Sequence, residues 1–336
     1  MKLIIQVPCF NEEETLSVTL SALPRTVPGF DSVEWLIIDD GSTDKTVEIA
    51  KKYGVDHIVR HAGNMGLARA FRTGIDACLH LGADVIVNTD ADNQYNADDI
   101  PALTLPILKH HADLVIGIRP ISSIEDFSQI KKILQKLGSW VVRLASKTDV
   151  PDATSGYRAM SRSAAQHLMV FNNYTYTLET IIQAGQKNMA IVSVPIRVNK
   201  QLRPSHLVKS VPDYIRKSIL TILRIFIIYR PFVFFGTIGG ALFFAGFLIG
   251  LRFLWNYLGG EGSGHIQSLI LSSILLGMGF QTLLISFIAD LLSANRKLLE
   301  DIRFRTFQLK KDEHSDGTNP KDSDFHSESF KNEKAL

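Results

Sequence analysis

Cysteine is scarce in this sequence: only Cys9 and Cys78 occur among 336 residues, far apart and in apolar surroundings. A disulfide framework or a zinc site would need more thiols, or histidines at ligand spacing, so both kinds of stabilisation are excluded. Reduced, buried cysteines are typical of a domain in the cytosol. Excess charge is absent as well, because 36 Lys and Arg face 34 Asp and Glu and leave a formal net charge of +2. No nucleic-acid partner is therefore expected.

Long apolar runs are absent from the first 210 residues and concentrated further along the chain. Residues 1–210 mix charged and apolar side chains, residues 231–292 are mostly apolar, and the residues after Lys311 are polar with charges of both signs. Composition thus divides the chain into five segments. They are a folded α/β domain over 1–210, an amphipathic juxtamembrane helix over 211–230, a two-helix transmembrane anchor over 231–292, a basic cytoplasmic helix over 293–311 and a disordered tail over 312–336.

Within the first domain, short runs rich in Val, Ile and Leu alternate with segments whose apolar residues recur at helical spacing. The predicted strands are Lys2–Val7, Val33–Ile38, His57–Val59, Asp84–Thr89 and Leu114–Ile118. The predicted helices are Glu13–Leu23, Thr43–Tyr53, Gly66–Leu81 and Asp98–His110. Repeated strand–helix–strand units indicate an α/β fold with a Rossmann-like, mostly parallel sheet covered on both faces. Ligands of such sheets bind beyond the carboxyl ends of the strands.

The pattern between residues 120 and 230 is less regular. We expect a helix over Phe127–Ser146, a loop over Asp152–Arg158, helices from Ser161 and over Tyr176–Gln186, a strand over Ala190–Val194 and an amphipathic helix over Val211–Tyr229. The last of these carries three cationic side chains among many Ile and Leu, immediately before a long apolar run. That combination favours a helix lying in the membrane interface.

Two apolar runs, Phe232–Leu251 and Ile266–Ala289, are each long enough to cross the hydrocarbon core of a bilayer. A short glycine-rich turn at residues 259–262 joins them. Lys and Arg flank both runs on the outer sides, whereas the connection carries only Arg252, which can extend to the far interface. This asymmetry predicts an integral membrane protein with two spans, whose folded domain and C-terminus are both cytoplasmic.

Asp90 and Asp92 follow the fourth predicted strand directly. Side chains two residues apart at a strand end project to the same side, so both carboxylates can reach one hard cation. Gln94 adds a further oxygen, directly or through water. The three residues are candidate ligands of Mg²⁺ or Mn²⁺, and a cation held there would neutralise a departing diphosphate.

Polar loops follow the other predicted strands at the same edge of the sheet. Pro8, Asn11 and Glu12 follow the first strand, and Asp40 follows the second. The third is followed by a Gly-containing turn that opens a helix, where backbone N–H groups face an anion. Asn64 and Arg69 in that turn are candidates for contacting a nucleotide. Four such loops at successive strand ends are much stronger evidence of a ligand-binding site at this edge than any one loop would be.

The motif order over residues 1–210 resembles the GT-A glycosyltransferases of family 2, and within them the polyprenyl-phosphate sugar synthases of the dolichyl-phosphate mannose synthase type. The resemblance implies that Pro8, Asn11 and Glu12 shape the nucleoside pocket and that Asp40 binds the base. It implies metal and diphosphate binding by Asp90, Asp92 and Gln94. The segment Asp152-Ala153-Thr154-Ser155-Gly156-Tyr157-Arg158 resembles the family's D-x-x-S-G-[FY]-R, which borders the sugar and the acceptor.

Basic residues between the metal edge and the membrane indicate how a lipid phosphate would be held. We expect Arg119 and Arg203 to bind it, with Ser205 and Lys209 nearby. The family often has Gly-Ser-Lys after this arginine, whereas this chain has Arg203-Pro204-Ser205-His206-Leu207 and its lysine only at Lys209, which leaves the role of that lysine open. Asp92, Asp152, Arg119 and Arg158 form the candidate catalytic set.

The expected reaction moves a sugar from a UDP- or GDP-linked donor to polyprenyl (undecaprenyl or dolichyl) phosphate at the cytoplasmic membrane face. A phosphate monoester is already ionised near neutral pH, so the enzyme needs alignment and leaving-group stabilisation more than a general base. Direct displacement follows, with inversion implied by the family. In the alternative, the acceptor is a hydroxyl of a glycolipid or polysaccharide and Asp152 is the general base. A non-catalytic membrane scaffold is disfavoured by the intact Asp90 and Asp92. Lateral packing of the anchor makes a homo-oligomer plausible, and the sugar and base remain open.

Overall fold

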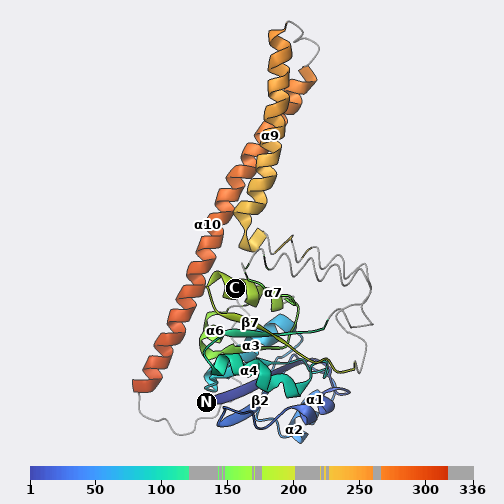
Figure 1. Ribbon diagram of the computed structural model, residues 1–336, viewed down its shortest axis with the longest axis vertical. Helices are drawn as coiled ribbons and strands as arrows, with labels where there is room; N and C mark the ends of the chain where they lie inside the picture. The colour runs from blue at the N-terminus through green and yellow to red at the C-terminus, as the bar shows by residue number, and fades with distance from the viewer. Residues whose placement is uncertain are drawn as a thin grey trace.

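The computed structural model describes residues 1–120, 148–168, 176–200, 227–259 and 266–316, with a few isolated residues between these ranges (Figure 1). The expected helix at 127–146, most of the expected amphipathic helix at 211–229 and the chain after Asp316 lie outside the described residues. The described part comprises an α/β domain and a long pair of helices that extends away from it.

A seven-stranded sheet forms the centre of the α/β domain, in the order β3-β2-β1-β4-β6-β5-β7. Its parallel strands are β1 (Lys2–Cys9), β2 (Ser32–Asp39), β3 (His57–Arg60), β4 (Val85–Asn88), β5 (Leu114–Ile118) and β7 (Ile191–Pro195). The expectation of a mostly parallel sheet is confirmed. All of these strands end at one edge, as the sequence pattern required.

One strand, β6 (Arg158–Ser161), runs antiparallel between β4 and β5, and it corrects the expectation of a loop that included Arg158. Its four residues contain no β-branched side chain, so local propensity does not predict a strand. Pairing with neighbours on both sides supplies the backbone hydrogen bonds instead. Because β6 runs in the opposite direction, its first residue lies at the edge where the parallel strands end. The residues before it therefore reach the same edge as Asp90 and Arg119.

Helices cover both faces of the sheet (Figure 1). One face carries α1 (Leu16–Ala22), α2 (Thr46–Lys52) and α4 (Ile100–Leu108), which follows the short 3-10 helix η1 (Ala97–Asp99). The other face carries α3 (Leu67–His80), α6 (Arg162–His167) and α7 (Thr177–Gln186). Strand periodicity explains the two cores: Leu3 and Ile5 of β1 pack on the first face, and Ile4 packs on the second.

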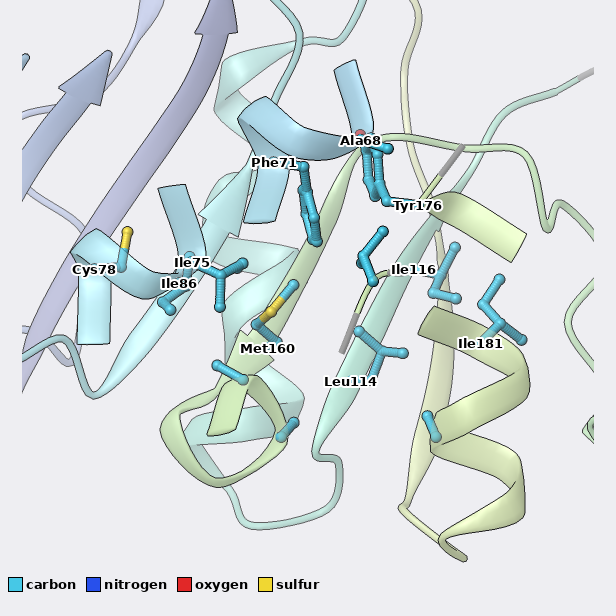
Figure 2. Close-up of a cluster of buried hydrophobic side chains, with 14 of the residues drawn as sticks. Ala68, Phe71, Ile75, Cys78, Ile86, Leu114, Ile116, Met160, Tyr176 and Ile181 are labelled. Carbon is cyan, nitrogen blue, oxygen red and sulfur yellow. The ribbon is translucent and has the colours of Figure 1, made fainter. Parts of the chain in front are cut away.

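The second core lies between α3, the sheet and α7 (Figure 2). Phe71 and Ile75 of α3 meet Ile86, Ile116 and other strand residues there, and all of these are buried. Full burial of such a side chain contributes about 1.5–3 kcal/mol, so this core fixes the strands whose ends carry the polar loops.

Helices α9 (Pro231–Leu258) and α10 (Ile266–Asp316) pack against each other and are each long and apolar enough to cross a membrane. Most of their apolar side chains are exposed, as lipid-facing residues are and those of a soluble core helix are not. Glycines allow the backbones to approach closely: a Cβ at Gly279 would lie 2.5 Å from the Phe243 nitrogen, and one at Gly239 would lie 2.9 Å from that of Leu283.

Helix α10 continues without a break from the second span to Asp316. The residues expected to form a separate basic helix at 293–311 are thus its continuation, and residues 312–316 are helical where a disordered tail was expected to begin. The reason is local: this segment contains several good helix formers, Leu, Arg, Lys and Glu, and no Gly or Pro until Gly317, and each added residue of a growing helix gains one hydrogen bond.

Candidate active site

The carboxyl edge of the sheet gathers the candidate residues from loops that are far apart in sequence. Pro8 lies at the end of β1, Asp40 directly follows β2, and Asp90 and Asp92 follow β4. Arg119 follows β5, and Asp152 belongs to the segment that leads into β6. The parallel strands and the reversed β6 together bring these loops to one edge.

Asp90 and Asp92 stand in a tight loop after β4. The Asp92 Oδ1 accepts the Gln94 N–H at 3.1 Å. Asn93, which lies between Asp92 and Gln94, has a left-handed φ of 54°. The Thr19 hydroxyl of α1 donates to the Ala91 carbonyl at 2.7 Å and fixes the loop from below. Burial and the neighbouring Asp92 carboxylate raise the pKa of Asp90 to about 7. A cation between the two carboxylates would relieve this repulsion.

The donor set of this loop suits Mg²⁺ or Mn²⁺, because two carboxylates and an amide offer the oxygen ligands that these ions prefer. The described part of the chain contains no group of three His, Cys, Asp or Glu placed to hold a metal by themselves. Two carboxylates leave positions open for oxygens from elsewhere, and a donor diphosphate supplies such oxygens. The residues present therefore fit the expected ion.

Asp40 has a structural task. Its Oδ1 accepts the Met65 N–H at 2.9 Å and its Oδ2 accepts the Gly66 N–H at 2.8 Å, while His61 Nδ1 lies 2.7 Å from Oδ1. Gly66 has φ +91°, a backbone conformation that suits glycine, and it begins α3. Asp40 thus holds the turn between β3 and α3 in place, and base binding by Asp40 remains an expectation.

Asp39, the last residue of β2, was missed by the sequence analysis. It is fully buried, and its Oδ1 accepts the Ser42 N–H at 3.0 Å. Its Oδ2 lies 2.9 Å from Arg60 Nε without the alignment of a hydrogen bond. Because this oxygen is buried against Arg60, a polar ligand atom does not reach it unless the Arg60 side chain moves. Two adjacent Asp residues in a sequence do not reveal which carboxylate bonds to the protein's own backbone, so Asp39 could not be distinguished from Asp40.

Asn11 and Glu12 connect the loops after β1 and β2. The Asn11 N–H donates to the Ser42 hydroxyl, and the Asn11 Oδ1 accepts the Thr43 N–H, both at 2.9 Å. The Glu12 N–H donates to Thr46 Oγ1 at 2.9 Å. These bonds give the loops a common shape at the edge. Asn64 in the next loop and Arg69 in the first turn of α3 are exposed.

Arg119 and Asp152 form a buried bidentate ion pair. Arg119 Nε donates to Asp152 Oδ2 at 2.8 Å and Nη2 donates to Oδ1 at 3.0 Å, while Nη2 also donates to the Thr154 hydroxyl at 2.7 Å. Arg119 is 9% exposed and Asp152 only 1%. Burial opposes ionisation of Asp152, but the hydrogen bonds and charge of Arg119 outweigh it and hold the pKa of Asp152 below its usual value.

Arg158 lies beneath the site and does not line it. It is fully buried, and its guanidinium donates to the carbonyls of Ser155 and Thr177 and to the Thr180 hydroxyl. Its carbon Cζ lies 5.3 Å from the centre of the Tyr176 ring. A sugar donor or an acceptor substrate cannot touch this buried side chain. We therefore assign Arg158 the role of positioning α7 and of supplying positive charge near Asp90.

The candidate acceptor residues Arg203, Ser205 and Lys209 lie outside the described residues. The segment that leads to them is anchored at the metal loop, because the Asn199 N–H donates to the Gln94 carbonyl at 2.8 Å. Asn199 Nδ2 also donates to the Asn93 carbonyl at 2.9 Å. The chain at Asn199 is therefore bonded to the loop that carries Asp90 and Asp92, four residues before Arg203 in the sequence.

Comparison with known proteins places the chain in a family. Residues 4–169 match the model of Glycosyl transferase family 2. A UDP-N-acetylglucosamine–dolichyl-phosphate N-acetylglucosaminyltransferase of Methanococcus voltae is 30% identical over 213 residues, covering 57% of this chain and 83% of that protein. An undecaprenyl-phosphate mannosyltransferase of Micrococcus luteus is 28% identical over 206 residues, covering 58% of this chain and 83% of that protein.

Among solved structures, the glucosyl-3-phosphoglycerate synthase of Mycobacterium tuberculosis, in complex with Mn²⁺, UDP and glucosyl-3-phosphoglycerate, superposes with a TM-score of 0.52 at 20% identity. The match covers 66% of this chain and 79% of that one, and it confirms the expected GT-A fold. Fold and sequence together define a glycosyltransferase of the α/β class. The chain belongs to glycosyl transferase family 2, and it is a glycosyltransferase.

Proposed function

We propose that this protein transfers a sugar from a nucleoside-diphosphate donor to polyprenyl phosphate. The observation that carries the proposal is the meeting of two carboxylates and a buried arginine at one sheet edge, in a chain that also has two apolar helices suited to a membrane. The two relatives named above act on lipid phosphates by their names. The solved synthase was crystallised with Mn²⁺ and UDP.

In the proposed reaction, Asp90, Asp92 and Gln94 hold Mg²⁺ or Mn²⁺, which supplies positive charge to the leaving diphosphate. The loops at Pro8, Asn11, Glu12 and Asn64 enclose the nucleoside and its phosphates, with Asp39 or Asp40 toward the base and Arg69 at the rim. An oxygen of the lipid phosphate attacks the anomeric carbon, the bond to the donor diphosphate breaks, and the nucleoside diphosphate leaves with the electron pair. The family implies inversion at that carbon.

The state of Asp152 supports a phosphate acceptor over a hydroxyl acceptor. A general base needs an oxygen that is free to take a proton and a pKa near the working pH. Both oxygens of Asp152 accept hydrogen bonds from Arg119, and the pKa of the carboxyl is held low. A lipid phosphate dianion needs no such base. Asp152 then serves to orient Arg119 toward the acceptor, where we also place Arg203, Ser205 and Lys209.

Sidedness belongs to the same proposal. Lys and Arg lie outside the two apolar helices and almost not between them, so we place the catalytic domain and the end of α10 on the cytoplasmic side. Nucleotide sugar and lipid phosphate would meet at that surface. The choice of UDP or GDP, and of the sugar, is left to experiment.

The test is incubation of purified protein in lipid nanodiscs with polyprenyl phosphate and a panel of radiolabelled UDP- and GDP-sugars. Label from one donor should enter the organic phase as a polyprenyl phosphate sugar when Mg²⁺ or Mn²⁺ is present. Chelation with EDTA, and the Asp92→Ala variant, should each reduce transfer by orders of magnitude because a charged ligand is lost. Transfer by Asp92→Ala at the wild-type rate in chelator would refute the metal assignment. Labelling of a hydroxyl lipid but not of the phosphate would refute the acceptor.

A further inference from the structure

The backbone of Gly156 is held at both its N–H and its carbonyl by the segment that carries Asp90 and Asp92. Asn88, two residues before Asp90, donates its Nδ2 to the Gly156 carbonyl at 2.9 Å. The Gly156 N–H donates to the hydroxyl of Tyr95, three residues after Asp92, at 3.0 Å. Residues on either side of the carboxylate pair thus fix the backbone of Gly156 through both its N–H and its carbonyl, which belong to two successive peptide groups.

The Gly156 backbone lies directly against Asp90. A Cβ built on Gly156 would lie 3.1 Å from both carboxylate oxygens of Asp90 and 2.9 Å from the Tyr176 hydroxyl. Such distances are shorter than ordinary van der Waals contacts of a Cβ atom. A methyl group there would displace the Asp90 carboxylate or the Tyr176 hydroxyl, so the backbone at Gly156 limits where the Asp90 carboxylate can turn.

Asn88 has little freedom to release that backbone. It is fully buried at the end of β4, where its Oδ1 accepts Gln6 Nε2 at 2.9 Å and its Nδ2 also donates to the Tyr176 hydroxyl at 3.0 Å. Tyr176 is in turn stacked on Phe71 of α3 with ring centres 3.9 Å apart (Figure 2). The core between α3 and the sheet therefore extends, through Asn88, to the backbone beside the metal carboxylate.

We infer that Asn88 and Gly156 are positioning residues for the metal. Asn88 fixes the Gly156 backbone by its bond to the carbonyl, and that backbone holds the Asp90 carboxylate in the orientation that binds the cation. The inference rests on the proposed metal-dependent function. Residues that orient metal ligands commonly contribute tenfold to a hundredfold in metal affinity. Both residues are buried, so we infer that they act through Asp90.

The test compares Gly156→Ala with Gly117→Ala, a control that is equally crowded. A Cβ at Gly117 in β5 would lie 3.0 Å from the Ile196 side chain and 3.1 Å from the Tyr157 carbonyl, away from any carboxylate. Mn²⁺ alone is titrated into full-length protein in nanodiscs, and free Mn²⁺ is measured by electron paramagnetic resonance. Gly156→Ala should weaken Mn²⁺ binding by about tenfold or more, whereas Gly117→Ala should bind as wild type does.

Two further variants keep the inference falsifiable. Asn88→Ala removes the donor to the Gly156 carbonyl without adding an atom near Asp90, so it serves if Gly156→Ala does not fold, and it should also weaken Mn²⁺ binding. The double variant Gly156→Ala/Tyr176→Phe removes the Tyr176 hydroxyl from the new methyl group but leaves Asp90 crowded, so its Mn²⁺ affinity should stay low. Recovery of wild-type affinity in this double variant would overturn the inference.

Failure of the inference can be told apart from failure of the proposed function. If wild type and Asp92→Ala both bind no Mn²⁺, the proposed metal site itself is wrong. If wild type binds Mn²⁺ and Asp92→Ala does not, but the variants at Gly156 and Asn88 bind as wild type does, the metal site stands and the positioning role is refuted.

Discussion

At the scale of single residues, the buried pair of Arg119 and Asp152 makes the sharpest prediction. Removing one partner of such a pair typically costs about 3–5 kcal/mol, because the other charge stays buried without compensation. We therefore expect Arg119→Ala and Asp152→Ala each to lower the melting temperature as well as activity. The double variant should regain much of the stability, since neither charge is then left alone, but none of the transfer.

The measurement is a double-mutant cycle in which thermal unfolding and transfer kinetics are recorded for the same four proteins. Asp152→Asn alone would not separate the two acceptor hypotheses, because it would disturb Arg119 whether or not Asp152 is a base. A double variant that regains both stability and transfer would refute the proposed role of Arg119 in binding the acceptor.

Position at a strand end was enough to predict where Asp90, Asp92 and Arg119 come together, because parallel strands share one edge, whereas Asp152 reaches that edge because β6 runs antiparallel. Side-chain partners could not be predicted in this way. Each depends on a residue distant in sequence: Asp152 is 33 residues from Arg119, and Asn88 is 68 from Gly156. The burial of Arg158 likewise follows from the direction of β6, which no local pattern revealed.

At the scale of elements, segments with a clear local pattern were predicted well even when they are short, whereas β6 was not predicted. The prediction for β5, Leu114–Ile118, agrees with the structure at both ends, and Ser161 caps α6 by accepting the Ala164 N–H as a helix start from Ser161 requires. The four residues of β6 are a strand only because β4 and β5 pair with them. Tertiary pairing of this kind overrides local propensity, and it set the path of the Asp152–Tyr157 segment.

A contact between elements predicts how the catalytic domain is held on its helices. The Tyr229 hydroxyl, just before α9, donates to Glu179 of α7 at 2.9 Å, and both residues are buried. The guanidinium of Arg296 in α10 lies 4.2 Å from the centre of the Tyr229 ring. One tyrosine thus contacts the domain and both parts of the anchor.

Tyr229→Phe removes that hydroxyl and leaves a buried carboxylate with one donor fewer, at a cost of about 1–3 kcal/mol. We expect a lower melting temperature and reduced transfer to long-chain polyprenyl phosphate in nanodiscs, with little change for a short-chain, water-soluble acceptor. Tyr53→Phe is the control, because Tyr53 is exposed on the catalytic domain. Equal losses with both acceptors would show that the contact stabilises the fold without orienting the domain.

At the scale of the whole molecule, α10 links the membrane to the catalytic domain. A helix of 51 residues is about 76 Å long, more than twice the roughly 30 Å of a bilayer core. Its first part packs on α9, and it also contacts α6 of the catalytic domain. Composition revealed the two spans, but it could not reveal that the second continues as one helix alongside the domain, because that depends on the absence of a break and on packing against α6.

This arrangement predicts that residues near the end of α10 lie on the same side of the membrane as the active site, and the connection between the spans lies on the other. Cysteines introduced at Ser263 and Ser315 report the two sides. The native Cys9 and Cys78 are buried, and burial raises the pKa of both thiols, so they contribute little background labelling. In intact cells, a membrane-impermeant maleimide should label Ser263→Cys, whereas Ser315→Cys should react only after permeabilisation. Equal labelling of both in intact cells would contradict two spans with a cytoplasmic catalytic domain.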